Sequence, residues 1–179
     1  MIAFDTETTG LLHPDGTRLF NQPFIIEFYA CKFNKSGKII SEFETFLKPP
    51  IPLPEIITKI TGITDSDLKD APNFLEIYDE LSDFFLGEKD IFAHNCSFDI
   101  NILKNELMRY EKEFKFPWPK NHYCTVELSH TIQNKRLKLE QLYFIATGKT
   151  FDAHRAKADT AALVECIIWL GENDFIKNW

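Results

Sequence analysis

The sequence predicts an α/β fold in which a mixed β-sheet of about five strands is flanked by helices. Two segments rich in β-branched and aromatic residues, 24–33 and 38–47, are joined by the turn-forming segment 34–37, which is typical of a hairpin. Short apolar runs then alternate with segments of helical periodicity, as in α/β sheets. The chain of 179 residues is 44% hydrophobic and 26% charged, so we expect one domain over residues 1–179.

Each remaining strand is expected where a short apolar run stops at polar residues. The first is residues 1–4, which end at the polar segment that begins with Asp5. Residues 91–93 form a second buried run that ends at His94, and residues 122–124 are expected to form the last strand. The hairpin comes first and the later strands alternate with helices, so the sheet should be mixed in direction.

The helices are expected from apolar residues at helical spacing and from their start signals. Pro72 leads into one of them, and Ser97 is predicted to cap another. The expected helical segments are 55–60, 73–86, 97–110, 126–132, 139–147 and 159–170.

Composition limits the function classes. With 20 Lys+Arg against 27 Asp+Glu the net charge is −7, which on charge alone argues against a nucleic-acid partner. No apolar run approaches the roughly 20 residues of a membrane span, and no secretory signal is visible at the N-terminus. The 4 cysteines form no CxxC pair, which favours free thiols in a reducing compartment. We therefore expect a cytoplasmic protein with no membrane contact.

Asp5 and Glu7 are the first candidate site residues. In an extended strand alternate residues share a face, so both carboxylates should point the same way. Two like charges this close are unfavourable unless a cation neutralises them, and oxygen ligands suit Mg²⁺ or Mn²⁺. Taken alone, such a pair is more often a solvated strand end. Thr8, Thr9 and Gly10 follow as a tight turn whose N–H groups could approach an anionic or sugar group.

Two further acidic positions lie later in the chain. Asp99 follows residues 91–93 in the first turn of a helix, where an acid by itself merely complements the helix dipole. Asp159 begins the last helix, and His154 precedes it by five residues in a loop. Ligands in α/β sheets collect at the ends of strands, which would bring Asp5, Glu7 and Asp99 together.

The three segments FDTETTG (4–10), HNCSFD (94–99) and HRAKAD (154–159), in this order, resemble the motifs of the DEDDh 3′–5′ exonuclease family. This family includes the proofreading epsilon subunit of DNA polymerase III. The segment TGITD (61–65) is similar to the variant found in polymerase C-type exonuclease domains. The resemblance extends over essentially the whole chain and implies an RNase H-like fold.

The resemblance also implies roles for individual residues. Asp5, Glu7, Asp99 and Asp159 would hold two divalent ions, Mg²⁺ with Mn²⁺ as a substitute, and His154 would be the general base. Thr8 and Leu11 would hold and wedge the terminal nucleotide, and Phe98 would pack against it. Thr61 stands where many relatives have histidine, so a substrate contact from that side chain is in doubt.

The implied activity is metal-dependent hydrolysis of phosphodiester bonds at the 3′ end of nucleic acid, with release of nucleoside monophosphates. Single-stranded or frayed DNA is the first expectation, since aromatic and leucine contacts suit unstacked bases. A 3′–5′ exoribonuclease is the alternative, and a non-catalytic polymerase-accessory module is a third reading. Polymerase association and oligomeric state stay open. Setting aside the four acids assigned to metal leaves 20 against 23, or −3, so charge no longer opposes a nucleic-acid partner.

Overall fold

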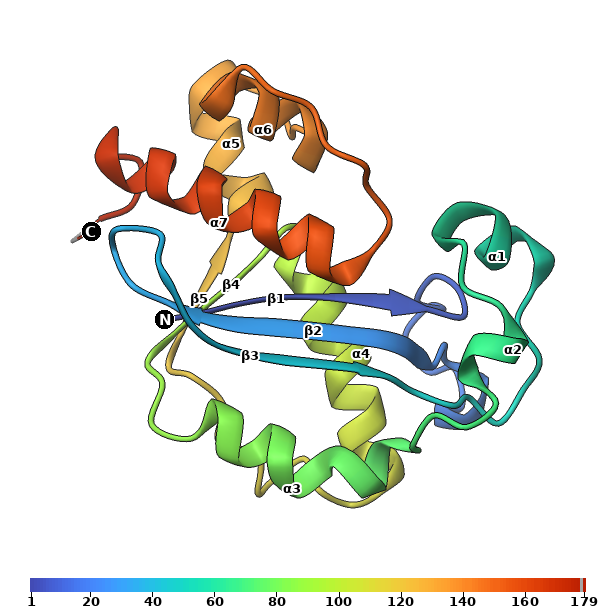
Figure 1. The fold of residues 1–179 in the computed structure, drawn as a ribbon. Coiled ribbons are helices and arrows are strands. Elements are labelled where there is room, and N and C mark those ends of the chain that lie inside the picture. The colour runs from blue at the N-terminus through green and yellow to red at the C-terminus, as the bar shows by residue number, and fades with distance from the viewer. Residues whose placement is uncertain (178) are drawn as a thin grey trace.

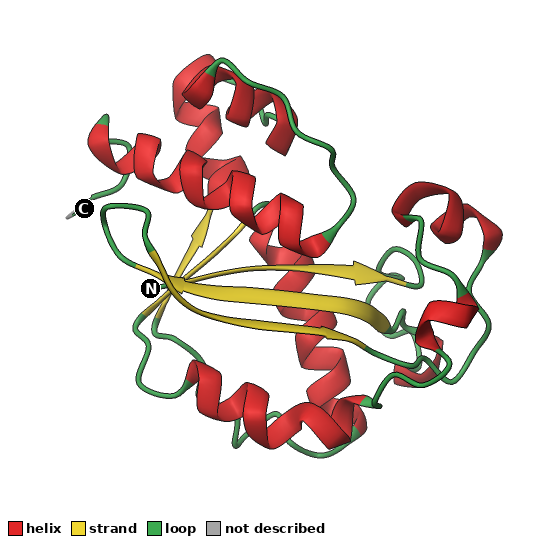
Figure 2. Cartoon of the chain, in the orientation of Figure 1, coloured by secondary structure: helices red, strands yellow, loops and turns green. Residues whose placement is uncertain are grey.

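The computed structural model describes residues 1–177 and 179 of the chain. A five-stranded sheet in the order β3-β2-β1-β4-β5 lies between helices on both of its faces (Figure 1 and Figure 2). The strands are β1 (Ile2–Thr8), β2 (Ile25–Phe33), β3 (Ile39–Phe46), β4 (Asp90–Ala93) and β5 (Asn121–Cys124). The helices are α1 (Glu55–Thr61), α2 (Asp65–Leu68), α3 (Phe74–Phe85), α4 (Cys96–Arg109), α5 (Thr125–Gln133), α6 (Leu139–Thr147) and α7 (Ala156–Glu172), with a single 3₁₀ turn, η1 (Leu19–Asn21).

The strand directions confirm the prediction of a mixed sheet. The hairpin strands β2 and β3 are antiparallel, and β2 also pairs antiparallel with β1. Strand β4 runs parallel to β1, and β5 runs parallel to β4. The central strand β1 is therefore hydrogen-bonded on both sides, and its register sets the position of every side chain along it.

Alternate residues of β1 face two separate cores. Ile2 and Phe4 pack on the face covered by α3 and α4, where Phe4 meets Phe85 edge-on at 6.3 Å between ring centroids. Ala3 belongs to the other core, which α6 and α7 cover with residues such as Leu163. Asp5 and Glu7 share the face of Ala3, so the period of two directs both carboxylates toward α7.

Two elements begin or end three or more residues away from the sequence prediction. Strand β1 continues to Thr8 instead of ending at residue 4, because pairing with β2 stabilises the extended backbone under its polar residues. Helix α7 begins at Ala156, three residues before the predicted start at 159. The first N–H of this helix donates to a buried carboxylate of the sheet, Glu27, at 3.0 Å.

The predicted cap at Ser97 is wrong. Helix α4 already begins at Cys96, and its N-cap is Asn95, which has a left-handed backbone (φ 66°) and makes no side-chain capping bond. Asparagine tolerates this conformation better than most residues, and it lets the chain turn sharply from β4 into α4. None of the helices in the described part of the chain is long and apolar enough to span a membrane.

Candidate active site

Three carboxylates gather where β1 passes the start of α7. Oxygens of Asp5, Glu7 and Asp159 all lie within 4.8 Å of one another. Asp5 and Glu7 reach this point because they share one face of β1, and Asp159 reaches it from the first turn of α7. The fold therefore brings Asp159 next to Asp5 and Glu7, which lie more than 150 positions earlier in the chain. The distances between their oxygens suit a bound cation.

Asp99 approaches the same strand from the opposite face of the sheet. It lies in the first turn of α4 and is buried. Its Oδ1 accepts hydrogen bonds from the backbone N–H of Thr6 at 3.2 Å and from the Thr6 hydroxyl at 2.8 Å. Thr6 is the residue between Asp5 and Glu7, so its side chain points away from theirs and holds the fourth carboxylate beside the cluster.

Burial and mutual repulsion raise the pKa values of these acids. Loss of hydration is the largest cause for Asp5, whose pKa is raised well above its usual range, and the charge of Asp99 follows. Burial and the neighbouring Asp159 raise the pKa of Glu7 to about 8. Burial raises the pKa of Asp99 to about 7, although the Thr6 hydrogen bonds oppose the shift. Burial and repulsion make the charged carboxylates unfavourable, so this site favours the binding of a cation or of a proton.

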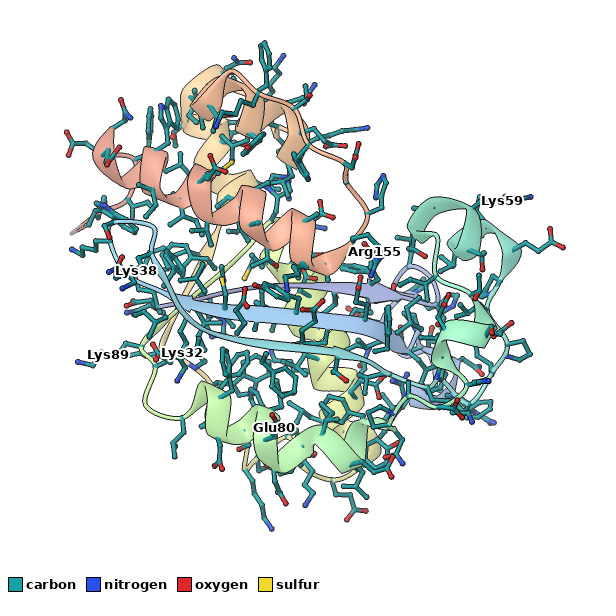
Figure 3. The ribbon with its side chains drawn as sticks, in the orientation of Figure 1. Lys32, Lys38, Lys59, Glu80, Lys89 and Arg155 are labelled. Carbon is teal, nitrogen blue, oxygen red and sulfur yellow. The ribbon has the colours of Figure 1, made fainter. Side chains whose placement is uncertain are left out.

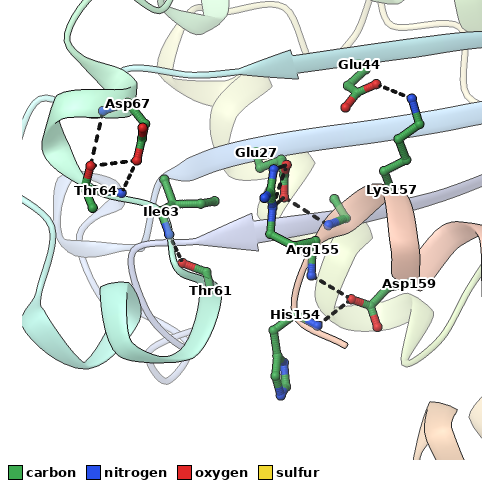
Figure 4. A network of polar contacts seen from close by, with 11 residues as sticks. Glu27, Glu44, Thr61, Ile63, Thr64, Asp67, His154, Arg155, Lys157 and Asp159 are labelled. Atoms are coloured by element: carbon green, nitrogen blue, oxygen red, sulfur yellow. Dashed lines mark hydrogen bonds and ion pairs between the residues drawn. The ribbon is translucent and has the colours of Figure 1, made fainter. Parts of the chain in front are cut away.

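Asp159 also shapes the loop before α7. Its Oδ2 accepts from the backbone N–H groups of His154 at 2.8 Å and Arg155 at 3.0 Å. His154 has a left-handed backbone (φ 72°), which is uncommon for histidine, and its side chain is exposed. In Figure 4 the imidazole points away from Asp159 and toward solvent. The carboxylate thus positions the backbone of His154 and leaves the ring unencumbered.

Glu27 is a residue of this site that sequence reasoning did not identify. It lies on β2 directly opposite Glu7 and is only 2% exposed. Arg155 donates to it through Nη2 at 2.7 Å and through Nε at 3.1 Å, and the N–H of Ala156 donates at 3.0 Å (Figure 4). Figure 3 shows Arg155 at the start of α7, above the strands. A lone acid within an apolar strand was the available signal, since a buried charge requires a partner.

A cavity of about 420 Å³ opens beside the carboxylates and contains both histidines of the motif segments. His94, from the end of β4, has Nδ1 2.9 Å from the hydroxyl of Thr125, and burial lowers its pKa to about 4. His94 is therefore neutral near pH 7, and its ring joins β4 to α5. Lys138, the residue before α6, lines the same cavity and brings a positive charge to it.

The residues expected to contact the nucleotide lie at the end of β1, in the turn that follows it, and in the first turn of α4. The hydroxyl of Thr8 donates to the carbonyl of Gly10 at 2.6 Å, which closes the turn, and Leu11 beyond it is 80% exposed. Phe98 is partly buried against the core under α3 and α4. Thr61 is buried, and its hydroxyl donates to the carbonyl of Ile57 and accepts from Ile63, so this side chain serves the turn after α1.

A mixed sheet in this order, covered by helices on both faces and with carboxylates at its central strand, is an RNase H-like α/β fold. Within that class the chain belongs to the RNase_T exonuclease family, whose model matches residues 2–167. The predicted fold and the predicted exonuclease enzyme are both confirmed, and exonucleases are hydrolases.

Known proteins resemble the chain in sequence or in fold. The "DNA polymerase III PolC-type" of Caldanaerobacter subterraneus subsp. tengcongensis is 36% identical over 169 residues, which are 93% of this chain and 11% of that protein. The chain thus corresponds to about a tenth of that relative. The solved nuclease domain of 3′hExo, a DEDDh family member bound to rAMP, has a TM-score of 0.76 at 16% identity, covering 96% of this chain and 91% of that chain. Exonuclease X in complex with 5′ overhanging duplex DNA has a TM-score of 0.67 at 20% identity, covering 97% and 92%.

Proposed function

We propose that this protein removes nucleoside monophosphates from the 3′ end of DNA, single-stranded or frayed, in a reaction that requires divalent metal ions. The observation that carries the proposal is the cluster of Asp5, Glu7 and Asp159, whose oxygens lie within 4.8 Å of one another. Membership of the exonuclease family supports the reaction class. The polymerase relative supports DNA as the substrate, cytoplasmic action and association with a replicative polymerase.

The residues fit the metal ions that this reaction uses. The donors are carboxylate oxygens, which suit Mg²⁺ and Mn²⁺. The raised pKa values of Asp5 and Glu7 reflect burial and repulsion, which a bound cation would relieve. We assign Asp5, Glu7, Asp99 and Asp159 to two ions. When bound, such ions lower the pKa of the attacking water and stabilise charge on the scissile phosphate.

The other residues then position the substrate and move the proton. His154 accepts the proton of the attacking water on its exposed imidazole, while its backbone N–H donates to Asp159. A positioned base of this kind contributes roughly 10²–10⁴-fold. Lys138 contacts a phosphate oxygen at the rim of the cavity. Thr8, Leu11 and Phe98 hold the terminal nucleotide, with Leu11 against its base.

The test is a digestion of 5′-labelled single-stranded DNA, duplex DNA and RNA with Mg²⁺, with Mn²⁺ or with EDTA. The expected result is a ladder that shortens from the 3′ end of DNA in the presence of either metal and not in EDTA. Faster shortening of RNA would support the exoribonuclease alternative. Internal cleavage, or no cleavage with any metal, would contradict the proposal.

Two variants sharpen this test. Asp159→Asn removes one charge from the cluster and should abolish the ladder while the protein stays folded by circular dichroism. Asp152→Asn changes an exposed acid in the same loop and should leave the ladder unchanged. Near-normal activity of Asp159→Asn would overturn the metal assignment.

A further inference from the structure

An apolar surface lies next to the turn that follows β1. Residues 9–13 and 20–24 line a groove of about 580 Å³, and Ile51 completes its wall. Two large apolar side chains of this groove face solvent, Leu11 at 80% exposure and Phe20 at 73%. Phe20 lies on the one-turn helix η1, which no motif of the sequence includes.

The loop that carries Phe20 is anchored by Arg109, whose side chain is 11% exposed. Nη2 of Arg109, on α4, donates to the carbonyls of Leu19 at 3.2 Å, Gln22 at 2.7 Å and Pro23 at 3.0 Å. The guanidinium also lies 3.9 Å from the centre of the Phe24 ring. The loop is therefore anchored on both sides of Phe20.

Glu106 gives this arginine its counter-charge. It is only 3% exposed, and its Oε1 lies 2.9 Å from Nη1 of Arg109. The same oxygen accepts from the N–H of Ile25 on β2 at 3.0 Å. Burying an ion pair opposes folding unless its hydrogen bonds compensate for the lost hydration. Here those bonds join the loop to both α4 and the sheet.

A second set of hydrogen bonds fixes the two exposed side chains relative to each other. The side chain of Gln22 is buried, and it accepts from the N–H of His13 at 3.0 Å and donates to the carbonyl of His13 at 3.2 Å. The segment that carries Leu11 is thereby tied to the segment that carries Phe20. Internal hydrogen bonding thus holds an outward-facing apolar surface in one arrangement before any ligand arrives.

We propose that Phe20, with Ile51, forms a stacking site for a nucleobase of the substrate strand, one that lies upstream of the terminal nucleotide contacted by Leu11. Residues 9–13 of the groove directly follow β1, the strand that carries Asp5 and Glu7, so the groove begins next to the end of that strand. The proposed path of the substrate runs from a 3′ end at the carboxylates, past the end of β1, to this groove. Every base has a face that stacks on an aromatic ring, worth about 1–3 kcal/mol per base. A loop that is already ordered strengthens the binding further, because little conformational entropy is lost when the base binds. The inference rests on the proposed exonuclease function.

The experiment compares a short oligothymidylate of about ten nucleotides with the p-nitrophenyl ester of thymidine 5′-monophosphate, which offers no upstream base. Phe20→Ala should raise the KM for the oligonucleotide roughly 5- to 100-fold and leave turnover of the ester unchanged. Phe20→Trp should restore the low KM. Phe114→Ala removes a phenylalanine that is 94% exposed in the turn after α4, and it should affect neither substrate.

The loss of the stacking contact should also weaken binding of the oligonucleotide when no hydrolysis takes place. Anisotropy of the labelled oligonucleotide in EDTA should show weaker binding by Phe20→Ala and unchanged binding by Phe114→Ala. An unchanged KM and affinity for Phe20→Ala would refute the stacking site while the exonuclease function stands. A parent protein that hydrolyses neither substrate would instead refute the proposed function.

Discussion

Replacing Glu7 by glutamine should stabilise the metal-free fold while it disables the site. Glu7 binds its proton more tightly in the folded protein, because burial and Asp159 raise its pKa from 4.5 to about 8. The unfolded chain therefore releases the proton at lower pH. The contribution of Glu7 to the free energy of unfolding is therefore highest below pH 4.5 and falls as the pH rises to about 8. Glutamine keeps the shape of the side chain and does not titrate, so it contributes no such pH dependence to the free energy of unfolding.

The size of the effect follows from the shift. The difference between 4.5 and about 8 corresponds to about 5 kcal/mol as an upper limit above pH 8. The amide of glutamine gains no charge but must still be accommodated at a partly buried position. We expect a gain of about 2–4 kcal/mol near pH 8.5 and less than about 1 kcal/mol near pH 5.

Urea unfolding followed by circular dichroism in EDTA measures both values. Glu80→Gln, a change at an exposed position on α3 (Figure 3), is the matched control and should leave the free energy of unfolding unchanged at both pH values. Adding Mg²⁺ should stabilise the parent more than Glu7→Gln, because only the parent keeps the full set of carboxylates. The reasoning would be refuted if Glu7→Gln is less stable than the parent near pH 8.5. It would also be refuted if the variant gains as much stability near pH 5 as near pH 8.5.

Three further predictions concern the base, the anchor of α7 and the core. His154→Ala should lower kcat roughly 10²–10⁴-fold and leave Mn²⁺ affinity by calorimetry unchanged, and an unaltered rate would place the base elsewhere. Glu27→Gln should lower both kcat and Mn²⁺ affinity, whereas Glu44→Gln, which breaks the exposed ion pair of Glu44 with Lys157, should change neither. Leu81→Ala should destabilise the fold by about 2–5 kcal/mol in urea, since this side chain is fully buried, and a loss under 1 kcal/mol would contradict the core described for α3.

The carboxylate cluster shows how far local pattern reasoning reaches. The shared face of Asp5 and Glu7 follows from the period of a strand, which needs no knowledge of the rest of the chain. The approach of Asp159 to the same face could be expected once the ordered motifs had indicated the fold. The hydrogen bonds of Thr6 to Asp99 were not predictable, because they depend on how closely α4 packs beneath β1.

Glu27 and Phe20 show where such reasoning stops. Glu27 faces Glu7 and Arg155 only because β1 and β2 pair in one register, and a shift by one residue would turn it to the other core. Phe20 lies in a segment without periodicity, and its exposure depends on the buried contacts of Arg109. Both positions result from contacts between residues that are far apart in the sequence.

The sequence by itself determined the α/β class, the mixed sheet and the set of acids and histidine that define the exonuclease motifs. These features arise from interactions between near neighbours: side-chain alternation, helical spacing and turn chemistry. The tertiary structure alone decided which partners hold those residues, namely Thr6 for Asp99, Glu27 for the start of α7, and Arg109 for the loop of Phe20. The reason is physical, since a buried charge or hydrogen-bonding group is satisfied by whatever the packing of distant elements brings within reach.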